Sequence, residues 1–246
     1  MATIPTPGTT GNDTIVPGTG NETLYGDPYF TGSPDGLGPL TAGKGGNDIL
    51  DATGDENHLI GDAEEIAGTG RGGNDTLSAT GDGNFLAGDG GNALLGNARG
   101  GNDVLSVIGG NNDLYGDALG MAESARGGND VLSATGSDND LYGEAIEMAE
   151  SARGGNDVLS ATGDGNRLFG DAGANVGIDM DDDARGGNDV LSATGGGNTL
   201  VGDAGQGISG TGRGGNDTLS ASGNETASMA MPAATYSATS AAATTR

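Results

Sequence analysis

A four-residue string, Gly-Gly-Asn-Asp, recurs along this chain and limits what the chain can fold into. Its seven copies begin at residues 45, 72, 100, 127, 154, 186 and 214, and a weaker Thr-Gly-Asn-Asp copy ends at Asp13. Most neighbouring copies are 27 or 28 residues apart. Self-similarity at a fixed period of roughly 20–50 residues is the signature of repeat architectures, in which each unit packs only on its neighbours. The chain is therefore expected to be a stack of similar coils.

Each unit contains two patterns that are typical of strands. In the fifth unit, residues 130–135 read Asp-Val-Leu-Ser-Ala-Thr and residues 139–143 read Asn-Asp-Leu-Tyr-Gly. Alternate residues of a strand face opposite ways, so stacking would align Leu132 with its equivalents in one core column and Leu141 in a facing one. Gly-rich segments between the patterns suit tight corners. We predict an all-β fold, a β-roll-like parallel β-solenoid with about 27 residues per coil.

A connector follows the second strand pattern and absorbs most of the length variation. It faces a column of mainly apolar residues that points away from the predicted core: Tyr25, Ile60, Ala87, Tyr115, Tyr142, Phe169 and Val201. The connector AIEMAESAR is rich in helix formers, so we expect a short helix that covers this column. The alternative is that the column is a surface for contact with another molecule.

The repeat also divides the chain. Residues 1–10 form an N-terminal extension, residues 11–226 the solenoid with an irregular insertion at 28–44, and residues 227–246 an Ala/Ser/Thr-rich tail. The last unit has a first strand pattern at residues 217–222 but no second one that matches the other units. A neighbouring molecule or the chain's own tail would have to complete this coil.

Stacking aligns acidic residues in two columns. Two carboxylates about 5 Å apart repel by roughly 1 kcal/mol in water and by several times more when partly desolvated, and the nine Lys and Arg residues are too few to fill both columns. Hard oxygen donors in Gly-rich turns favour several Ca²⁺ ions among them; the alternative is a solvated acidic face with Asn/Asp turn caps. The predicted metal ligands are, in the first column, Asp13, Asp48, Asp75, Asp103, Asp130, Asp157, Asp189 and Asp217, and in the second, Asp27, Asp62, Asp89, Asp117, Glu144, Asp171 and Asp203.

A third aligned row is neutral and allows two interpretations. Its amides are either secondary Ca²⁺ ligands, weaker than carboxylates, or a ladder of Asn side chains bonded to one another. The row consists of Asn57, Asn84, Asn112, Asn139, Asn166 and Asn198.

The turns resemble the repeats-in-toxin (RTX), or haemolysin-type, calcium-binding nonapeptide G-G-x-G-x-D-x-U-x, which residues 72–77 (Gly-Gly-Asn-Asp-Thr-Leu) match in their core. The likeness covers nearly all of residues 11–223. It implies a parallel β-roll, Ca²⁺ between successive turns, and folding on metal uptake outside a bacterial cell, in secreted or cell-surface form. It also implies type I export through an uncleaved C-terminal signal, and the first ten residues lack the basic and apolar regions of a signal peptide.

Composition excludes several classes of function. The net charge of −26 argues against nucleic acid, since phosphate binding needs a basic face. No apolar run is long enough for membrane insertion. The chain has no Cys, His58 is its single His, and every acidic pair belongs to a repeated column. We therefore expect that the protein is not an enzyme.

Basic residues are as regular as the acidic ones. One precedes each Gly-Gly pair: Lys44, Arg71, Arg99, Arg126, Arg153, Arg185 and Arg213. Acids three residues earlier, such as Glu123 and Glu150, suit helical ion pairs within the connector. The alternative is lateral contact with an acidic face of a neighbouring molecule.

Together these features predict a secreted calcium-binding structural protein. It would fold on binding Ca²⁺ and polymerise head to tail into an extracellular filament or layer, because the open ends of a solenoid recruit further strands. Two alternatives remain. One is an ice-binding solenoid that uses the regular Ser-x-Thr face, as at Ser133 and Thr135. The other is a monomeric Ca²⁺-binding protein.

Overall fold

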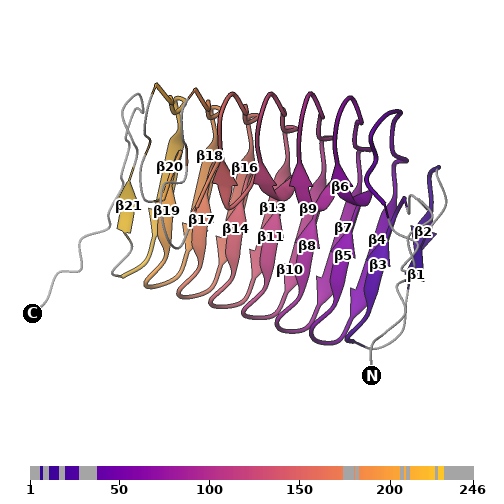
Figure 1. The fold of residues 1–246 in the computed structure, drawn as a ribbon. Helices are drawn as coiled ribbons and strands as arrows, with labels where there is room; N and C mark the ends of the chain where they lie inside the picture. Colours follow the sequence, from indigo (N-terminus) through magenta and orange to yellow (C-terminus); the bar gives the residue numbers. More distant parts are fainter. Residues whose placement is uncertain are drawn as a thin grey trace, which may run out of the picture.

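The computed structural model describes residues 6–7, 11–16, 20–27, 38–173, 180, 183–205, 208, 211–224 and 227–229. In these residues the chain winds into coils that lie side by side along one axis, with residues 6–7 and 227–229 at opposite ends of the stack (Figure 1). Equivalent strands of successive coils pair in parallel, and paired residues in the regular coils are 27 or 28 positions apart. The predicted parallel β-solenoid is confirmed.

Three parallel sheets run along the axis, and each coil contributes one strand to each long sheet. The nine-stranded sheet contains, in order, β1 (Thr6–Pro7), β3 (Thr23–Tyr25), β5 (His58–Ile60), β8 (Phe85–Ala87), β11 (Asp113–Tyr115), β14 (Asp140–Tyr142), β17 (Arg167–Phe169), β19 (Thr199–Val201) and β21 (Ala227–Met229). The eight-stranded sheet contains β2 (Thr14–Ile15), β4 (Ile49–Thr53), β7 (Thr76–Thr80), β10 (Val104–Ile108), β13 (Val131–Thr135), β16 (Val158–Thr162), β18 (Val190–Thr194) and β20 (Thr218–Ser222). The four-stranded sheet contains β15 (Glu147–Met148), β12 (Ala118–Met121), β9 (Gly90–Leu94) and β6 (Ala63–Ile66).

The two long sheets enclose the predicted core of stacked Leu side chains. Leu132 on β13 pairs in register with Leu105 and Leu159, and all three side chains are fully buried. Leu141 on β14 belongs to the same cluster from the facing sheet. Full burial of a Leu side chain contributes about 1.5–3 kcal/mol. Because every coil adds such side chains to one continuous column, the core grows with the number of coils.

The bend between the first and second strands depends on residues with positive φ. Gly136 has a φ of 140° and Asp138 a φ of 58°, and the preceding coil repeats this with Gly109 at 144° and Asn111 at 56°. Glycine tolerates the first conformation because it lacks a Cβ, and Asn and Asp tolerate the left-handed helical region better than most residues. The chain therefore reverses direction within four residues in each coil.

The connector is a strand and a turn, so the predicted helix is wrong. Glu147–Met148 form β15, which pairs with β12, and Glu150 turns the chain with a φ of 59°. The described residues contain no helix. Stacked connectors satisfy each other's backbone: Ala149 N–H donates to the Met121 carbonyl of the preceding coil at 2.9 Å. An isolated helix this short would leave most of its terminal N–H and C=O groups unpaired.

The connector nevertheless covers the aromatic column, as expected. The rings of Tyr115 and Tyr142 stack with centroids 4.9 Å apart, and those of Tyr142 and Phe169 with centroids 5.1 Å apart. Leu119 and Ile146 of the connectors pack against this cluster, and Tyr142 is 1% exposed. Internal packing, and not an exposed contact surface, accounts for the column.

Short strands form the first and last members of the nine-stranded sheet. β1, within the predicted N-terminal extension, pairs with β3, and β21, from the predicted tail, pairs with β19. The chain's own residues therefore supply the second strand of the last coil. In the predicted insertion, Leu40 and Lys44 form parallel bridges with Ile66 and Arg71, so residues 38–44 take the place of a connector. Residues 28–37 and 230–246 lie outside the described residues.

Candidate metal centre

The two acidic columns meet inside the solenoid. A first-column residue such as Asp130 stands at the start of the first strand of its coil, and a second-column residue such as Glu144 follows the end of the second strand. The bend between the strands brings these ends together. At the first coils, Asp27, Asp48 and Asp62 each place a carboxylate oxygen within 4.8 Å of those of the other two. All predicted metal ligands except the half-buried Asp13 are at most 1% exposed.

From Asp48 to Asp217, each first-column carboxylate uses one oxygen on the protein and leaves the other without a hydrogen-bond partner. The N–H of Asp103 donates to Oδ1 of Asp130 at 2.7 Å, and the N–H of Asp130 donates to Oδ1 of Asp157 at 2.7 Å. The same bond joins every consecutive pair from Asp13 to Asp217, with distances of 2.6–3.0 Å. The second oxygen, Oδ2, is buried without a hydrogen-bond partner in every described member from Asp48 to Asp217.

Second-column carboxylates bind the Gly-Gly turns. The N–H of Gly73 donates to Oδ2 of Asp62 at 2.9 Å, and the N–H of Gly187 donates to Oδ1 of Asp171 at 2.7 Å. Gly155 donates to Glu144 in the same way. Five members leave an oxygen buried and unpartnered: Asp27, Asp62, Glu144, Asp171 and Asp203. Together with the seven first-column oxygens they are the twelve buried side-chain atoms that lack a partner among the described residues.

Burial makes these carboxylates hard to ionise. Desolvation, with repulsion from neighbouring carboxylates, raises the pKa of Asp75 to about 8 and that of Asp189 to about 9, against an ordinary 3.8. Six others have a pKa raised well above the ordinary value, with desolvation as the largest cause: Asp62, Asp89, Asp103, Asp130, Glu144 and Asp171. Buried charges persist only when they are paired or bind metal. The columns therefore need either protons or cations.

The glycines of the turns leave room for the carboxylates because they lack a Cβ. A Cβ at Gly116 would overlap the carbonyl oxygen of Gly143 and meet Oδ2 of Asp130, and a Cβ at Gly72 would overlap Oδ1 of Asp89. Free carboxylate oxygens and backbone carbonyls therefore line the same narrow space. An all-oxygen donor set with several carboxylates suits Ca²⁺, whereas soft metals find no thiolate or imidazole there. The residues present fit calcium.

The neutral row forms an Asn ladder at the opposite end of the coils. Oδ1 of Asn139 accepts the N–H of Asn112 at 3.0 Å and the Nδ2–H of Asn112 at 2.9 Å. Asn57, Asn84 and Asn166 make equivalent bonds, and Asn198 accepts the N–H of Asn166 at 2.8 Å. Protein donors already occupy these amide oxygens, so the ladder interpretation describes the row, and we do not place it among the metal ligands.

A second, exposed Asn ladder was missing from the sequence-based prediction. Nδ2 of Asn129 donates to Oδ1 of Asn102 at 2.9 Å, and Nδ2 of Asn188 donates to Oδ1 of Asn156 at 2.8 Å. Its residues are the Asn of each Gly-Gly-Asn-Asp string. The signal was present in the sequence, because a side chain repeated at one position of every coil stacks on its own copies.

The basic row lies beside the metal centre and does not enter it. Backbone bridges join Arg126 to the equivalent Arg99 and Arg153. The predicted helical ion pairs do not form: neither Glu123–Arg126 nor Glu150–Arg153 is a salt bridge in the described part of the chain. The pairs presupposed a helical connector, whereas Glu123 has a φ of 65° in a turn.

Comparison with known proteins agrees with the geometry. The RTX calcium-binding nonapeptide repeat matches the chain in four copies, at residues 7–28, 124–145, 151–176 and 183–207. Each matched segment contains one residue of the first acidic column and one of the second; residues 124–145, for example, include Asp130 and Glu144. No curated protein and no solved structure matches the chain significantly. Within the described ranges, no helix has the length and apolar character needed to span a bilayer. The chain therefore carries RTX, or haemolysin-type, calcium-binding repeats and is a Ca²⁺-binding repeat protein with a β-solenoid fold.

Proposed function

We propose that this protein is a secreted bacterial structural protein whose solenoid folds when Ca²⁺ binds and then assembles head to tail outside the cell. The observation that carries the calcium-dependent part is the set of twelve buried, unpartnered carboxylate oxygens in two facing columns. A soluble fold rarely leaves even a few buried polar atoms unsatisfied. Here they all belong to the repeated acidic columns, which supports several metal ions along the axis.

The ligands we assign are the free oxygens of the two columns, between successive coils. Asp103, Asp130 and Asp157 contribute Oδ2 from the first column, and Glu144 and Asp171 contribute their free oxygens from the second. Bound Ca²⁺ would supply the positive charge that balances these carboxylates. The chain's own part is to hold the oxygens in place, through the N–H donors of the neighbouring coil and of the Gly-Gly turns.

Calcium binding and folding are coupled in this proposal. Without cations, each coil would place further carboxylates next to those of its neighbour, at a cost of at least roughly 1 kcal/mol per close pair. A site that exists only in the folded state adds its binding free energy to stability. RTX repeats are typical of secreted bacterial proteins, and extracellular calcium would switch folding on after export.

An architectural role fits the residues better than a catalytic one. His58 is exposed on β5 and stacks on Phe85, with ring centroids 5.3 Å apart. The buried acids are copies of one another in every coil, whereas a catalytic site is a unique constellation. We therefore propose that the chain is not an enzyme.

Head-to-tail growth has support at the ends of the sheets. β1 and β21 stand at the two edges of the nine-stranded sheet, and β2 and β20 at those of the eight-stranded sheet. Unpaired edges are templates for further strands. Because β21 already completes the last coil, assembly would join whole coils end to end and need not borrow a strand from a neighbour.

Circular dichroism and electron microscopy of the full chain, with Ca²⁺ and with excess chelator, test this function. At about pH 8 we expect a coil-like spectrum in chelator, a β-rich spectrum in Ca²⁺, and rods longer than one molecule only in Ca²⁺. A fully β-rich spectrum in chelator at that pH would contradict the coupling. Monomers at high protein and Ca²⁺ concentration would contradict assembly and favour a monomeric Ca²⁺-binding protein.

One observation favours ice binding as a second candidate. The outer face of the eight-stranded sheet carries hydroxyl side chains in register over three coils, with Ser133 and Thr135 aligned to their counterparts in β16 and β18. Ile108 and Asp51 interrupt the array. Thermal hysteresis of the Ca²⁺-loaded protein would support this role, and its absence together with polymers would leave the structural one.

A further inference from the structure

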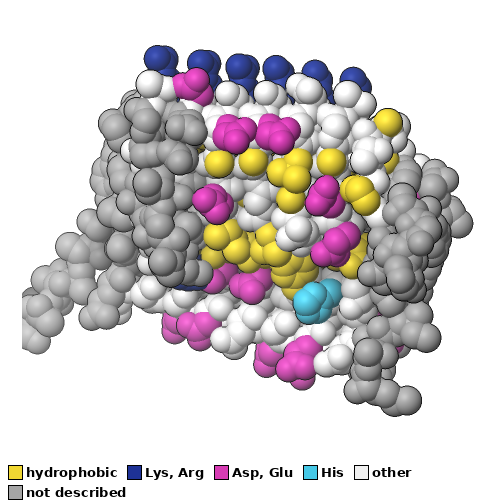
Figure 2. All heavy atoms as spheres, viewed as in Figure 1, with side chains coloured by type: hydrophobic (Ala, Val, Ile, Leu, Met, Phe, Trp, Pro, Cys, Tyr) yellow, Lys and Arg dark blue, Asp and Glu magenta, His cyan; other side chains and the backbone are white. Residues whose placement is uncertain are grey.

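A line of basic side chains follows one edge of the solenoid. Arg99, Arg126 and Arg153 are exposed at the end of their connectors, and backbone bridges hold each in register with the next. Their side chains therefore repeat once per coil, about 4.8 Å apart. Figure 2 shows Lys and Arg in a single row along the upper edge. This basic row comprises Lys44, Arg71, Arg99, Arg126, Arg153, Arg185 and Arg213.

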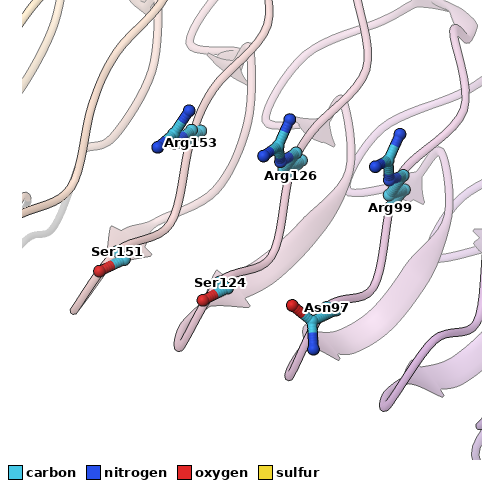
Figure 3. Close-up of a pocket in the computed structure, with 6 residues that line it drawn as sticks. All are labelled: Asn97, Arg99, Ser124, Arg126, Ser151 and Arg153. Carbon is cyan, nitrogen blue, oxygen red and sulfur yellow. The ribbon is translucent and has the colours of Figure 1, made fainter.

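The middle of the basic row borders a shallow depression. Its lining combines guanidinium groups with short polar side chains in two parallel lines (Figure 3): Arg99, Arg126 and Arg153, with Asn97, Ser124 and Ser151. In the described part of the chain, none of these three Arg side chains forms an ion pair or a side-chain hydrogen bond. Neighbouring cations at this spacing repel by about 1 kcal/mol in water. These three Arg side chains therefore have no ion-pair partner among the described residues.

The opposite edge of the solenoid carries exposed acids. They occupy the bends between first and second strands, whereas the basic row follows the connector at the other end of each coil. Figure 2 shows Asp and Glu side chains along the lower edge. Asp138 is exposed at a positive φ. Oδ1 of Asp82 and Oδ1 of Asp164 each accept a hydrogen bond from a backbone N–H of the following coil. This acidic edge comprises Asp55, Glu56, Asp82, Asp138 and Asp164, all exposed.

We propose that the basic row of one molecule binds the acidic edge of a second copy of this chain, side by side. The basic row repeats once per coil, and the acidic edge carries its acids in the second, third, fifth and sixth coils. The two rows therefore share the spacing of the coils, and opposite charges face each other at offsets of whole coils. Each copy offers a basic row on one edge and an acidic edge on the opposite one, so the lateral contact is heterologous, and copies related by translation add side by side without closing. The inference rests on the proposed self-assembly and adds a second direction to it, so that rods join laterally into a layer.

The contact is electrostatic and cooperative along the row. One exposed ion pair contributes about 0.2–1 kcal/mol, and several in register form a network. Arg suits such a row because its planar guanidinium binds carboxylates in a bidentate manner. Screening at high ionic strength shortens the range of these attractions. Lateral association should therefore weaken with salt, whereas end-to-end strand pairing should not.

The test reverses each row separately. One variant combines Arg99→Glu, Arg126→Glu and Arg153→Glu; the other combines Asp82→Lys, Asp138→Lys and Asp164→Lys. Each Ca²⁺-loaded variant is examined by electron microscopy and sedimentation at low and high salt. A β-rich spectrum in Ca²⁺ is the folding control. Arg→Gln and Asp→Asn versions replace any variant that fails it, and for these neutral versions the loss of layers in each variant alone is the test.

We expect layers from the wild type at low salt, single rods from each variant alone, and layers again from an equimolar mixture. The mixture restores opposite charges at both contacts, which a damaged fold could not do. Layers from either variant alone, or a mixture that stays as single rods, would overturn the inference while leaving head-to-tail assembly intact. Binding of the wild type to an immobilised sulfated polysaccharide without lateral association would instead assign the row to a polyanion. Monomers in every condition would refute both the inference and the proposed assembly.

Discussion

The N–H of Asp103 donates to Oδ1 of Asp130 at 2.7 Å, while Oδ2 of Asp130 lies buried without a partner. One side chain thus joins two coils with one oxygen and presents the other to the interior. The two roles can be separated by experiment, because an amide keeps the acceptor and loses the charge.

Asp130→Asn should weaken calcium binding without breaking the stack. The amide oxygen can still accept the Asp103 N–H, but the sites flanking this coil lose a charged ligand, and affinity follows the ligand charge count. Changes even in groups that only support metal ligands cost about 10–100-fold in affinity, so we expect at least a tenfold loss for part of the bound calcium by isothermal titration calorimetry. Asp138→Asn, on the exposed bend, is the control and should leave the isotherm unchanged. Identical isotherms for the two variants would remove Asp130 from the ligand set.

Without calcium, the fold should be favoured by acid. Desolvation raises the pKa of Asp48 to about 7, of Asp75 to about 8 and of Asp189 to about 9, from an ordinary 3.8. The folded state therefore binds protons more tightly than the unfolded chain. The resulting stability is complete below about pH 4 and is lost as the pH rises toward about 9. Far-ultraviolet circular dichroism in chelator should show β structure growing as pH falls; a calcium-free protein with more β structure at pH 8 than at pH 4 would contradict this.

Leu132→Ala should be far more destabilising than Val131→Ala. Leu132 is fully buried between two other Leu side chains of its column, whereas the neighbouring Val131 is 43% exposed. Truncating a buried Leu costs about 2–5 kcal/mol, and surface changes usually stay within about 0.5 kcal/mol. Urea unfolding at saturating Ca²⁺ gives the difference. Equal midpoints would mean that the Leu column is not the core.

Gly128→Ala should disrupt the stack, with Gly120→Ala as its matched control. A Cβ at Gly128 would overlap the carbonyl oxygen of Gly101, which is backbone and cannot swing aside, while a Cβ at Gly120 meets nothing within 4 Å. Overpacking of this kind costs about 1–3 kcal/mol or more. The melting temperature in Ca²⁺ should fall for the first variant and stay close to wild type for the second. A small effect at both positions would show that coils can separate locally without penalty.

Periodicity carried most of the prediction. A fixed period places each residue above its own copy, so the Leu columns, both acidic columns and the register follow from counting positions. The arrangement of the metal centre follows as well, because the bend returns Glu144 to the level of Asp130. None of this required knowledge of a contact between dissimilar residues.

The connector could not be predicted in the same way. Its Ala, Glu and Met residues favour a helix locally, but the stacked neighbour offers partners for its backbone groups, as the Ala149–Met121 bond shows. Local propensity gives way when tertiary contacts satisfy more hydrogen bonds. The same stacking created the outer Asn ladder, where Asn129 bonds to Asn102, although single residues in turns usually bond to their own backbone.

Every coil contacts the next through the same kinds of interaction, which include the packing of the Leu columns and the hydrogen bonds of the Asn ladders. One coil is therefore the unit that can be removed from this chain or added to it. Residues 127–153 begin and end at equivalent points of the repeat, and excising them would bring matching surfaces into contact without a seam. In such a one-dimensional array, stability changes by roughly one nearest-neighbour increment per module.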